Sequence, residues 1–170
     1  LNAVGKERCS TGAYFWDNKN RPECYLFQYT LNGSGTVKID GEAKIVDKGK
    51  GFFLKMPGPE CYYFDEQNNE GPWEFIYILF ECGAAVEYCR YIENHLGRII
   101  SLPVYSGAVE WIFELHAQAK RTNQNPFLLG SMVFSFLCAL CGVGKEKEKA
   151  ESPLIVGAKT YMEEMFMEPV

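Results

Sequence analysis

The sequence predicts a mainly β domain followed by helices, and a change of period along the chain leads to this fold class. From residue 24 to about residue 81, apolar residues alternate with polar ones in short runs broken by glycine and proline, which is typical of consecutive antiparallel strands. After residue 81 the apolar spacing becomes that of helices. Short strands at such close spacing predict a small β-barrel or jelly roll, with the helices after it.

Composition and charge exclude several classes of protein. With 170 residues, of which 47% are hydrophobic and 15% aromatic, the chain has enough apolar material for a core and is not a disordered segment. The formal net charge of −5 lacks the basic excess that a DNA- or RNA-binding face needs. We find no apolar run of the roughly 18 residues that a membrane span requires, and no signal-peptide pattern, so we expect a soluble protein.

The cysteines and histidines do not form a recognisable site. Seven cysteines are scattered through hydrophobic stretches without the spacing of a disulfide framework, so we expect reduced thiols and a cytoplasmic protein. Cys138 and Cys141 have the two-residue gap of a metal or redox motif, but no second pair accompanies them, which favours plain packing. His95 and His116 lie far apart in helix-like segments. The sequence therefore predicts no metal and no cofactor.

Turn residues divide the first half of the chain into strands. Asp40-Gly41 favours a tight hairpin turn, and Pro57-Gly-Pro59 turns the chain before a short aromatic run. Residues 14–16 are a further aromatic run. We expect strands at residues 24–32, 36–39, 43–47, 52–56, 61–64 and 73–81.

The second half has three helical stretches and a charged break. We expect helices at residues 83–95, ending at Gly97, at residues 106–122, and at residues 127–141, with an extended piece between the first two. Gly142 and Gly144 end the third helix, and the charged residues after them indicate a linker or a frayed helix end. Ser152-Pro153 then opens an amphipathic helix. The expected units are a barrel (1–82), a helical segment (83–144), a linker (145–152) and a final helix (153–170).

Four motifs occur in a characteristic order: residues 29–35 (YTLNGSG), 51–58 (GFFLKMPG), 61–63 (CYY) and 73–80 (WEFIYILF). Together they resemble the sensor domain of AraC-type transcription regulators, and residues 158–170 are similar to the opening helix of the helix-turn-helix domain that follows in that family. The resemblance implies a cupin-like β-barrel that binds a small effector, often a sugar, followed by helices that mediate dimerisation. Promoter DNA would be bound by the missing C-terminal domain, and residues 14–16 would form an arm over the barrel mouth or simply another strand.

Alternation along the strands and the family pattern together predict an effector site. On the first strand, Gln28 and Asn32 share the face that carries polar groups. The family pattern places Tyr63 in the lumen, with Phe75 and Tyr77 on the last strand. Aromatic faces suit sugar rings, and amides and hydroxyls suit their hydroxyl groups, although inward aromatic residues also fill barrel cores, as we expect for Trp73. The predicted ligand-binding residues are Gln28, Asn32, Tyr63, Phe75 and Tyr77.

The helical segment predicts a homodimer. The helix at residues 127–141 has more apolar perimeter than one barrel face can cover, so a second copy of the chain is the expected partner. The alternative is that both faces of this helix are covered within one chain. The predicted interface residues are Trp111, Leu115, Leu129, Val133 and Phe136.

Two other functions compete with effector sensing, and we expect neither. Cupin enzymes usually hold a metal with a His-x-His pair on one strand, but the expected strands have no histidine, and the frequent histidine of the family falls on Cys61. A metal-free cupin enzyme, such as a sugar epimerase or isomerase, needs a general base and acid, and Tyr63 and Tyr77 have no histidine partner. A free carbohydrate-binding module would have no use for the linker and the final helix.

Overall fold

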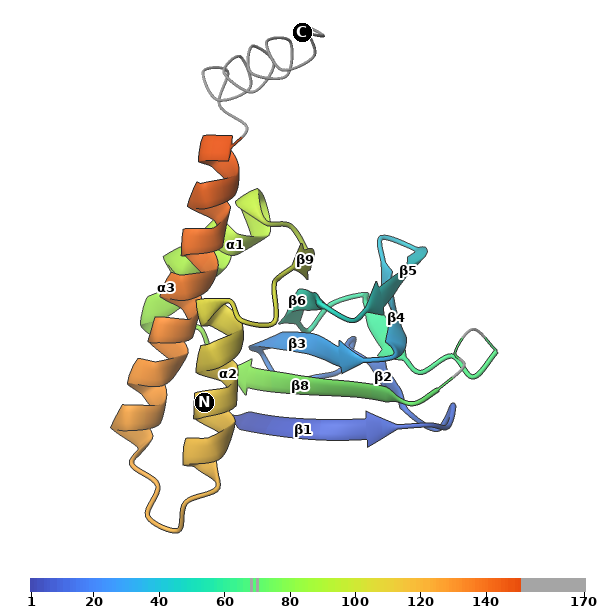
Figure 1. The fold of residues 1–170 in the computed structure, drawn as a ribbon, viewed down its shortest axis with the longest axis horizontal. Helices are drawn as coiled ribbons and strands as arrows, with labels where there is room; N and C mark the ends of the chain where they lie inside the picture. Colours follow the sequence, from blue (N-terminus) through green and yellow to red (C-terminus); the bar gives the residue numbers. More distant parts are fainter. Residues whose placement is uncertain (68, 70, 151–170) are drawn as a thin grey trace, which may run out of the picture.

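The computed structural model describes residues 1–67, 69 and 71–150, in which two β-sheets lie face to face and a layer of helices covers one of them (Figure 1). The predicted fold class, mainly β with C-terminal helices, is confirmed. All strand pairs are antiparallel. Sheet A contains, in spatial order, β1 (Ala3–Cys9), β8 (Trp73–Phe80), β3 (Cys24–Asn32), β6 (Lys50–Met56) and β9 (Ile99–Ser101). Sheet B contains β2 (Phe15–Asp17), β7 (Cys61–Tyr63), β4 (Ser34–Ile39) and β5 (Glu42–Asp47).

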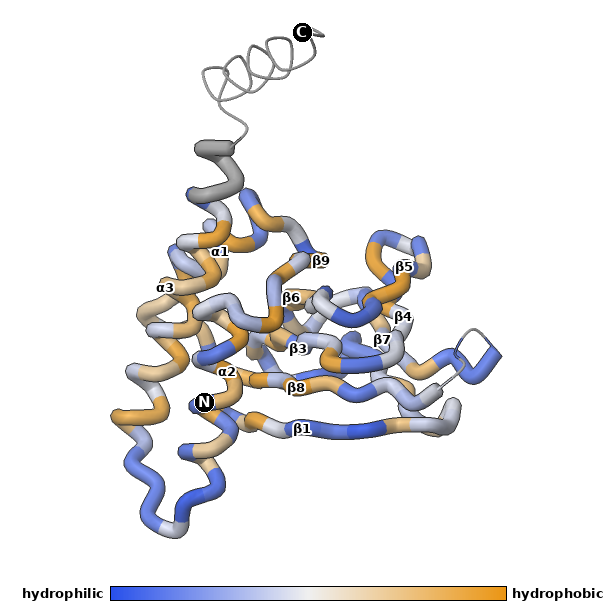
Figure 2. The backbone as a smooth tube through the Cα atoms, viewed as in Figure 1, coloured by the Kyte–Doolittle hydropathy of each residue, from blue (hydrophilic) through white to orange (hydrophobic). Residues whose placement is uncertain are grey.

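The expected strands at residues 24–81 are all present, and two more precede them. β1 has no counterpart among the expected strands because its middle, Lys6-Glu7-Arg8, is charged, and Figure 2 shows this hydrophilic stretch. Pairing with β8 makes it an edge strand of sheet A. β2 pairs with β7, so the interpretation of this aromatic run as another strand is confirmed.

The β4–β5 hairpin is built by the turn that its sequence predicts. Asp40 and Gly41 have φ values of 53° and 85°, and positive φ at both central residues is the requirement of the tight turn that matches the twist of a hairpin. Asp40 tolerates this conformation because its short polar side chain can bond locally, and Gly41 has no Cβ to clash.

Strand β3 separates two hydrophobic cores. Its residues Tyr25, Phe27 and Tyr29 pack with the helices, whereas Leu26 and its same-face neighbours point toward sheet B. A side chain on β3 therefore belongs either to the helix-facing core or to the interior of the two-sheet sandwich. This alternation follows the pattern of the sequence.

The helical layer consists of η1 (Gly83–Ala85), α1 (Val86–His95), α2 (Gly107–Ala119) and α3 (Pro126–Ala150). Gly97 follows α1 with a φ of 75°, as expected for a glycine at a helix C-terminus. α2 and α3 are joined by a short loop and lie side by side against sheet A, and α1 packs on α3 (Figure 1).

The expected end of α3 at Gly142 and Gly144 is wrong, because the helix continues through both glycines to Ala150. Gly144 allows close packing instead of a helix end. A Cβ at this position would lie 3.1 Å from Cε1 of Tyr91 on α1. The Lys and Glu residues that follow are good helix formers and extend α3. The rest of the expected linker and the final helix, residues 151–170, lie outside the described residues.

The expectation that no segment is apolar enough to cross a membrane is also wrong for α3. By length and composition, Pro126–Lys145 is a candidate span of 20 residues. Its residues Met132, Phe136 and Leu140 are instead buried against the rest of the domain. Of the apolar window in this span, 33% is buried inside the domain.

Four of the five predicted dimer-interface residues are buried within one chain, so that part of the prediction is wrong. Phe136 packs on Phe27 of sheet A with ring centroids 5.1 Å apart. The alternative interpretation holds for these faces of the helices, because sheet A, α1 and α2 cover them. Trp111 remains 36% exposed. The buried residues are Leu115, Leu129, Val133 and Phe136.

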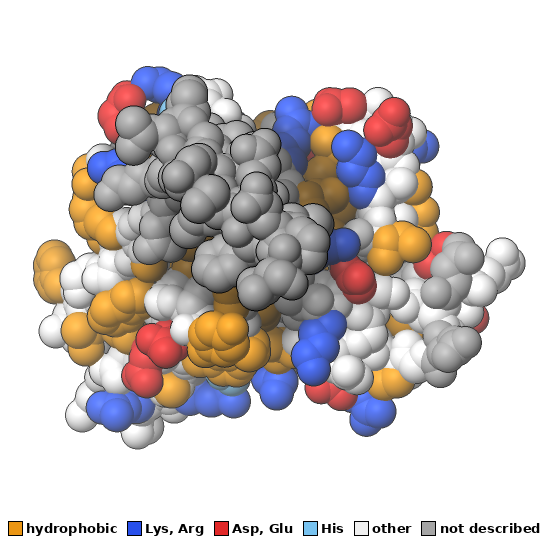
Figure 3. Space-filling view, turned by 45° about the horizontal axis from the view of Figure 1, so that its top comes forward, with side chains coloured by type: hydrophobic (Ala, Val, Ile, Leu, Met, Phe, Trp, Pro, Cys, Tyr) orange, Lys and Arg blue, Asp and Glu red, His pale blue; other side chains and the backbone are white. Residues whose placement is uncertain are grey.

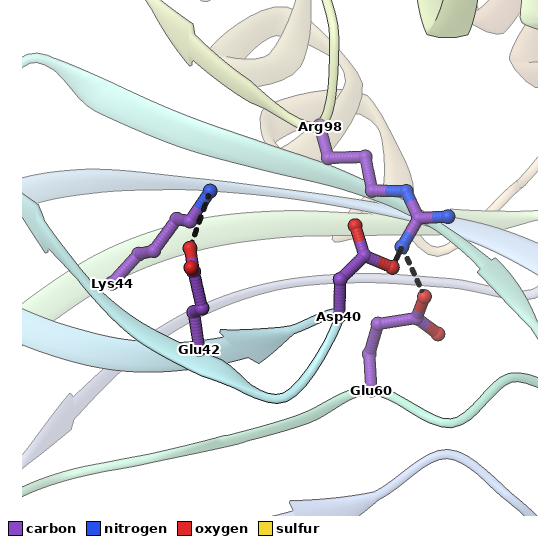
Figure 4. A network of polar contacts seen from close by, with 5 residues as sticks. All are labelled: Asp40, Glu42, Lys44, Glu60 and Arg98. Carbon is purple, nitrogen blue, oxygen red and sulfur yellow. Dashed lines mark hydrogen bonds and ion pairs between the residues drawn. The ribbon is translucent and has the colours of Figure 1, made fainter.

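A charged network ties the helical layer to sheet B at one end of the barrel (Figure 4). Arg98 lies between α1 and β9, and its guanidinium contacts Glu60 at 2.5 Å and Asp40 at 3.4 Å. Glu60 is buried, and a buried carboxylate is tolerated when it is paired and hydrogen-bonded. Arg98 thus connects the loop before β7 and the β4–β5 turn to the junction between α1 and β9.

Candidate functional site

A cavity of about 380 Å³, including its mouth, lies between the two sheets. Sheet A supplies β3 and β8, in which Leu26 pairs with Leu79 and Gln28 pairs with Tyr77. Sheet B supplies Tyr62 from β7, and the segment around β2 covers the mouth. The lining residues are Glu7, Tyr14, Trp16, Arg21, Leu26, Gln28, Tyr62, Tyr77 and Leu79.

Gln28 is the polar centre of this cavity. Its side chain is buried, and its Oε1 accepts a hydrogen bond of 3.4 Å from the Tyr14 hydroxyl. Its Nε2 has no hydrogen-bond partner among the described residues. Burying an amide donor without a partner costs about 1–3 kcal/mol, so this group is available to a ligand that brings an oxygen acceptor.

Three phenols surround Gln28, and each keeps its proton. Burial raises the pKa of Tyr14 and of Tyr62 well above the ordinary value of 10. Burial also raises the pKa of Tyr77, and the nearby Glu7 carboxylate adds to this effect. The cavity therefore offers neutral hydroxyl groups and an amide at neutral pH, which suits hydrogen bonding to a polar, uncharged molecule.

The mouth carries an aromatic ring and a cation. Trp16 is 40% exposed, and the guanidinium of Arg21 lies 4.5 Å from the centroid of its ring. This is the geometry of a cation–π contact, which holds the indole in place. Trp16 thus presents a fixed flat surface at the entrance, of the kind on which a sugar ring can stack.

The other half of the barrel interior is filled. Trp73 is fully buried, and its Nε1 donates a 3.0 Å hydrogen bond to Oγ1 of Thr30, whose hydroxyl donates to the backbone oxygen of Val46 at 3.1 Å. Phe75 lies between Trp73 and the cavity, with ring centroids 4.6 Å from Trp73 and 5.2 Å from Tyr14. Trp73 therefore fills the core, as the sequence predicts, and closes the cavity at this end.

The structure brings together three of the five predicted ligand-binding residues. Gln28 and Tyr77 line the cavity, and Phe75 lies on the same inner face. Tyr63 is misplaced in the prediction, because it lies on the outer face of sheet B, where its ring stacks on exposed Phe15 with centroids 5.9 Å apart. Its neighbour Tyr62 points inward instead, opposite Trp16 and Val37 in the register.

Asn32 is also misplaced in the prediction, because it is exposed and does not line the cavity. The strand has a register shift between Thr30 and Asn32, which interrupts the alternation of its side chains. In the register with β8, Asn32 lies opposite Glu74, whereas Gln28 lies opposite Tyr77, which lines the cavity.

The sequence analysis did not identify Glu7, Arg21 and Tyr62, which line the cavity. Glu7 lies on the charged strand β1, and Arg21 lies in a loop, so neither belongs to an apolar pattern. Tyr62 could have been found from Val37, because the inward direction of that apolar residue fixes which of the two tyrosines in β7 faces the lumen. No group of three or more His, Cys, Asp or Glu side chains that could hold a metal occurs among the described residues.

The fold and the cavity define a cupin-like ligand-binding domain. Residues 2–137 match the AraC-like ligand binding domain family, and since this match spans most of the sequence, the chain belongs to that family. The family consists of the ligand-binding domains of transcription regulators and not of enzymes.

Known proteins share this sequence and fold over part of their length. The raffinose operon transcriptional regulatory protein RafR of Pediococcus pentosaceus is 26% identical over 142 residues, which are 76% of this chain and 47% of RafR. Among solved structures, the AraC-like transcriptional activator CuxR has a TM-score of 0.54 at 9% identity, covering 84% of this chain and 48% of CuxR. ToxT from Vibrio cholerae O395 has a TM-score of 0.49 at 9% identity, covering 88% of this chain and 55% of ToxT. This chain spans about half the length of RafR and CuxR.

Proposed function

We propose that this chain is the effector-sensing and dimerisation module of an AraC-type transcription regulator, and that its effector is a small neutral sugar bound in the cavity around Gln28. The observation that carries the proposal is the unpaired Nε2 of Gln28 among three protonated phenols, with Trp16 at the mouth. A sugar hydroxyl can accept from this amide, and the apolar face of a sugar ring can stack on an indole. RafR is a raffinose operon regulator, which supports a sugar as the effector.

A titration tests the effector. Isothermal calorimetry with galactose, glucose, arabinose and raffinose, each added to the 170-residue chain, should show binding of at least one of them. Gln28→Leu should weaken that binding by about tenfold or more, because a hydrogen bond worth about 1.4 kcal/mol or more is lost. Gln67→Leu is the matched control, since Gln67 is exposed and lies outside this cavity. Binding that Gln28→Leu leaves unchanged would contradict the proposed site.

The regulator would bind promoter DNA through a C-terminal domain, in the cytoplasm. Three features support this: RafR extends over about twice the length of this chain, residues 158–170 resemble the opening helix of a helix-turn-helix domain, and the described cysteines are free. A protein in which this chain is joined to such a domain should therefore bind DNA in a sugar-dependent way, which a gel-shift assay with the DNA upstream of its own gene measures.

The dimer would use the outer face of α2 and α3. Figure 3 shows hydrophobic side chains gathered on the helical side of the molecule, and several of them are exposed. An exposed apolar patch of this kind on one face favours a self-complementary contact about a two-fold axis. The exposed apolar residues of these helices are Trp111, Phe113, Phe127, Leu128 and Phe134.

Sedimentation velocity at rising concentration tests the dimer. We expect a dimer at micromolar concentration that Trp111→Glu or Phe134→Glu dissociates, because either change places a charge on the proposed interface. The matched control is Ile45→Glu, which changes an exposed apolar residue of β5 far from the helices and should leave the dimer intact. A chain that stays monomeric would contradict the proposal.

A further inference from the structure

Two thiols meet where the barrel joins the helical layer. Cys82 follows the end of β8 and precedes η1, and Cys89 lies on α1. The Cys82 thiol donates a hydrogen bond to the sulfur of Cys89, and the two Sγ atoms are 2.8 Å apart. A disulfide bond has an S–S length of about 2.05 Å, so a small shift of these side chains is enough to join them.

The two thiols differ in their access to solutes. Cys82 is half-buried and lines a cleft of about 930 Å³, including its mouth, between the start of β3, the end of β8 and η1. Cys89 is fully buried and does not line this cleft. Burial raises the pKa of the Cys89 thiol. Cys82 is therefore the thiol that a dissolved reagent reaches first. Cys89 is the buried, protonated thiol that can react second.

The negative charge of the cleft favours an uncharged oxidant over an anionic one. Its walls carry the carboxylates of Glu23 and Glu81, together with Tyr25 and Val86. Carboxylates at the entrance repel anionic oxidants such as glutathione disulfide. A small uncharged hydroperoxide enters without this penalty.

We propose that Cys82 and Cys89 form a reversible redox pair that a small hydroperoxide converts into a disulfide. The sulfur of Cys82 attacks the hydroxyl oxygen of the hydroperoxide, so that an S–O bond forms, the O–O bond breaks, and the second oxygen takes the Cys82 thiol proton and leaves as water or alcohol. The sulfur of Cys89 then attacks the sulfur of Cys82, the S–S bond forms, the S–O bond breaks, and the hydroxide leaves as water with the Cys89 proton. The two thiols lose two electrons, and the peroxide gains them.

The disulfide would join two layers of the molecule. β8 carries Tyr77 and Leu79 into the cavity, and α1 packs on α3 in the helical layer. A covalent bond from residue 82 to residue 89 fixes the end of this strand to α1. The redox pair does not depend on the sugar-binding proposal, because neither thiol lines the cavity around Gln28.

Two other thiols are the natural controls. Cys24 lines the same cleft as Cys82, and Cys141 on α3 packs against the core cluster that contains Cys89. If the assignment of the pair is wrong, Cys24 or Cys141 should take the place of Cys82 or Cys89 in the disulfide. Cys138 is exposed, so the experiment uses a Cys138→Ser background to remove direct oxidation of that thiol.

The test is peroxide oxidation of the folded chain, followed by peptide mapping. The reduced protein is treated with hydrogen peroxide, quenched, and its thiols are counted in denaturant. We expect six thiols before treatment, since seven cysteines minus the removed one leave six, and four after it. Trypsin leaves Cys61, Cys82 and Cys89 in one peptide, residues 56–90, and cleavage after Glu81 and Glu87 then gives the fragments 82–87 and 88–90, which only a disulfide between Cys82 and Cys89 holds together. Dithiothreitol should restore all six thiols.

Each variant has its own expected result. Cys82→Ser should lose no thiol pair, and Cys89→Ser should stop at a sulfenic acid on Cys82 that dimedone traps. Cys24→Ser and Cys141→Ser should still form the bond between residues 82 and 89. A disulfide that maps to any other pair, or a count that stays at six in the parent chain, would overturn the proposal. Oxidation by glutathione disulfide as fast as by hydrogen peroxide at equal concentration would overturn the assignment of the oxidant.

Discussion

The two faces of sheet A use the same strands in different ways. Toward the helices, β3 presents Tyr25, Phe27 and Tyr29, which are buried among apolar side chains, and the Tyr29 hydroxyl donates to the backbone oxygen of Leu102 at 2.9 Å. Toward sheet B, the same strand presents Gln28, whose Nε2 has no partner among the described residues. One face is closed and apolar, and the other keeps an unpaired donor beside an open cavity.

This difference separates stability from recognition. The helix-facing core gains free energy from buried apolar area, whereas the unpaired amide of Gln28 costs free energy in the empty domain. A buried group that destabilises the empty state gains a partner when a ligand binds. Substitutions on the two faces of sheet A should therefore have opposite effects on stability and on binding.

The largest expected effect is on the helix-facing core. Phe136→Ala removes a fully buried ring that packs on Phe27, and it should lower the free energy of unfolding by about 3–5 kcal/mol. Urea denaturation followed by circular dichroism measures this change. The affinity of the folded fraction for the sugar should stay the same. A loss below about 1 kcal/mol would show that α3 is not part of the core.

A substitution in the closed half of the barrel interior, around Trp73, should lower the free energy of unfolding by a smaller amount. Thr30→Val removes the acceptor of the Trp73 indole and leaves a buried N–H group without a partner, which should cost about 1–3 kcal/mol. The same denaturation experiment measures it. Thr36→Val is the matched control on sheet B, because Thr36 is buried and no side-chain hydrogen bond is described for it. Equal losses in the two variants would contradict the role of the Trp73–Thr30 bond.

A substitution in the open half of the barrel interior, around Gln28, should weaken sugar binding and leave the free energy of unfolding nearly unchanged. Gln28→Leu replaces a buried amide by an apolar side chain of similar size, so the free energy of unfolding should change by about 1 kcal/mol or less in either direction. Chemical denaturation and calorimetry on the same sample compare stability with sugar affinity. A variant that unfolds far more easily would show that Gln28 supports the structure and not the ligand.

The smallest expected effect lies at the rim, far from both cores. The Lys50 ammonium holds the pKa of Asp47 below the ordinary value of 3.8, at a distance of 2.9 Å. Since the folded-state pKa is the lower one, the stabilisation is present above pH 4 and is lost as the pH falls through that lower pKa. Both side chains are about half exposed, so Lys50→Met should cost about 0.2–0.5 kcal/mol at pH 7. The difference between variant and parent should shrink as the pH falls through the lowered pKa of Asp47, which acid titration of the unfolding midpoint measures.

The regular alternation of side chains along the long strands predicts which residues face the helices and which face sheet B. Gln28, Phe75 and Tyr77 lie on long strands, where the two-residue period is unbroken, and all three reach the inner face. Tyr62 and Tyr63 lie on a strand of three residues, too short for the period to show which of them points inward. Asn32 lies just past a register shift, which no local sequence signal announces.

The other features that the sequence does not predict depend on tertiary contacts. The apolar perimeter of α3 indicates that the helix needs partners, but which of its faces the same chain covers depends on how the helices fold onto sheet A. The Cys82–Cys89 pair comes from the short η1 turn, which brings the end of β8 against α1. Arg21 reaches the cavity from a loop, where no periodic pattern exists.

The side-chain amide of Gln28 offers the most direct test of the sugar-binding account. In ¹H–¹⁵N spectra, its NH₂ resonances can be assigned by their loss in Gln28→Leu, and they should shift on addition of the sugar that calorimetry identifies. The amide resonances of Gln67 should not move, because that residue lies outside the cavity. A saturating sugar that leaves the Gln28 resonances in place while it shifts others would contradict the account, since the ligand would then bind elsewhere.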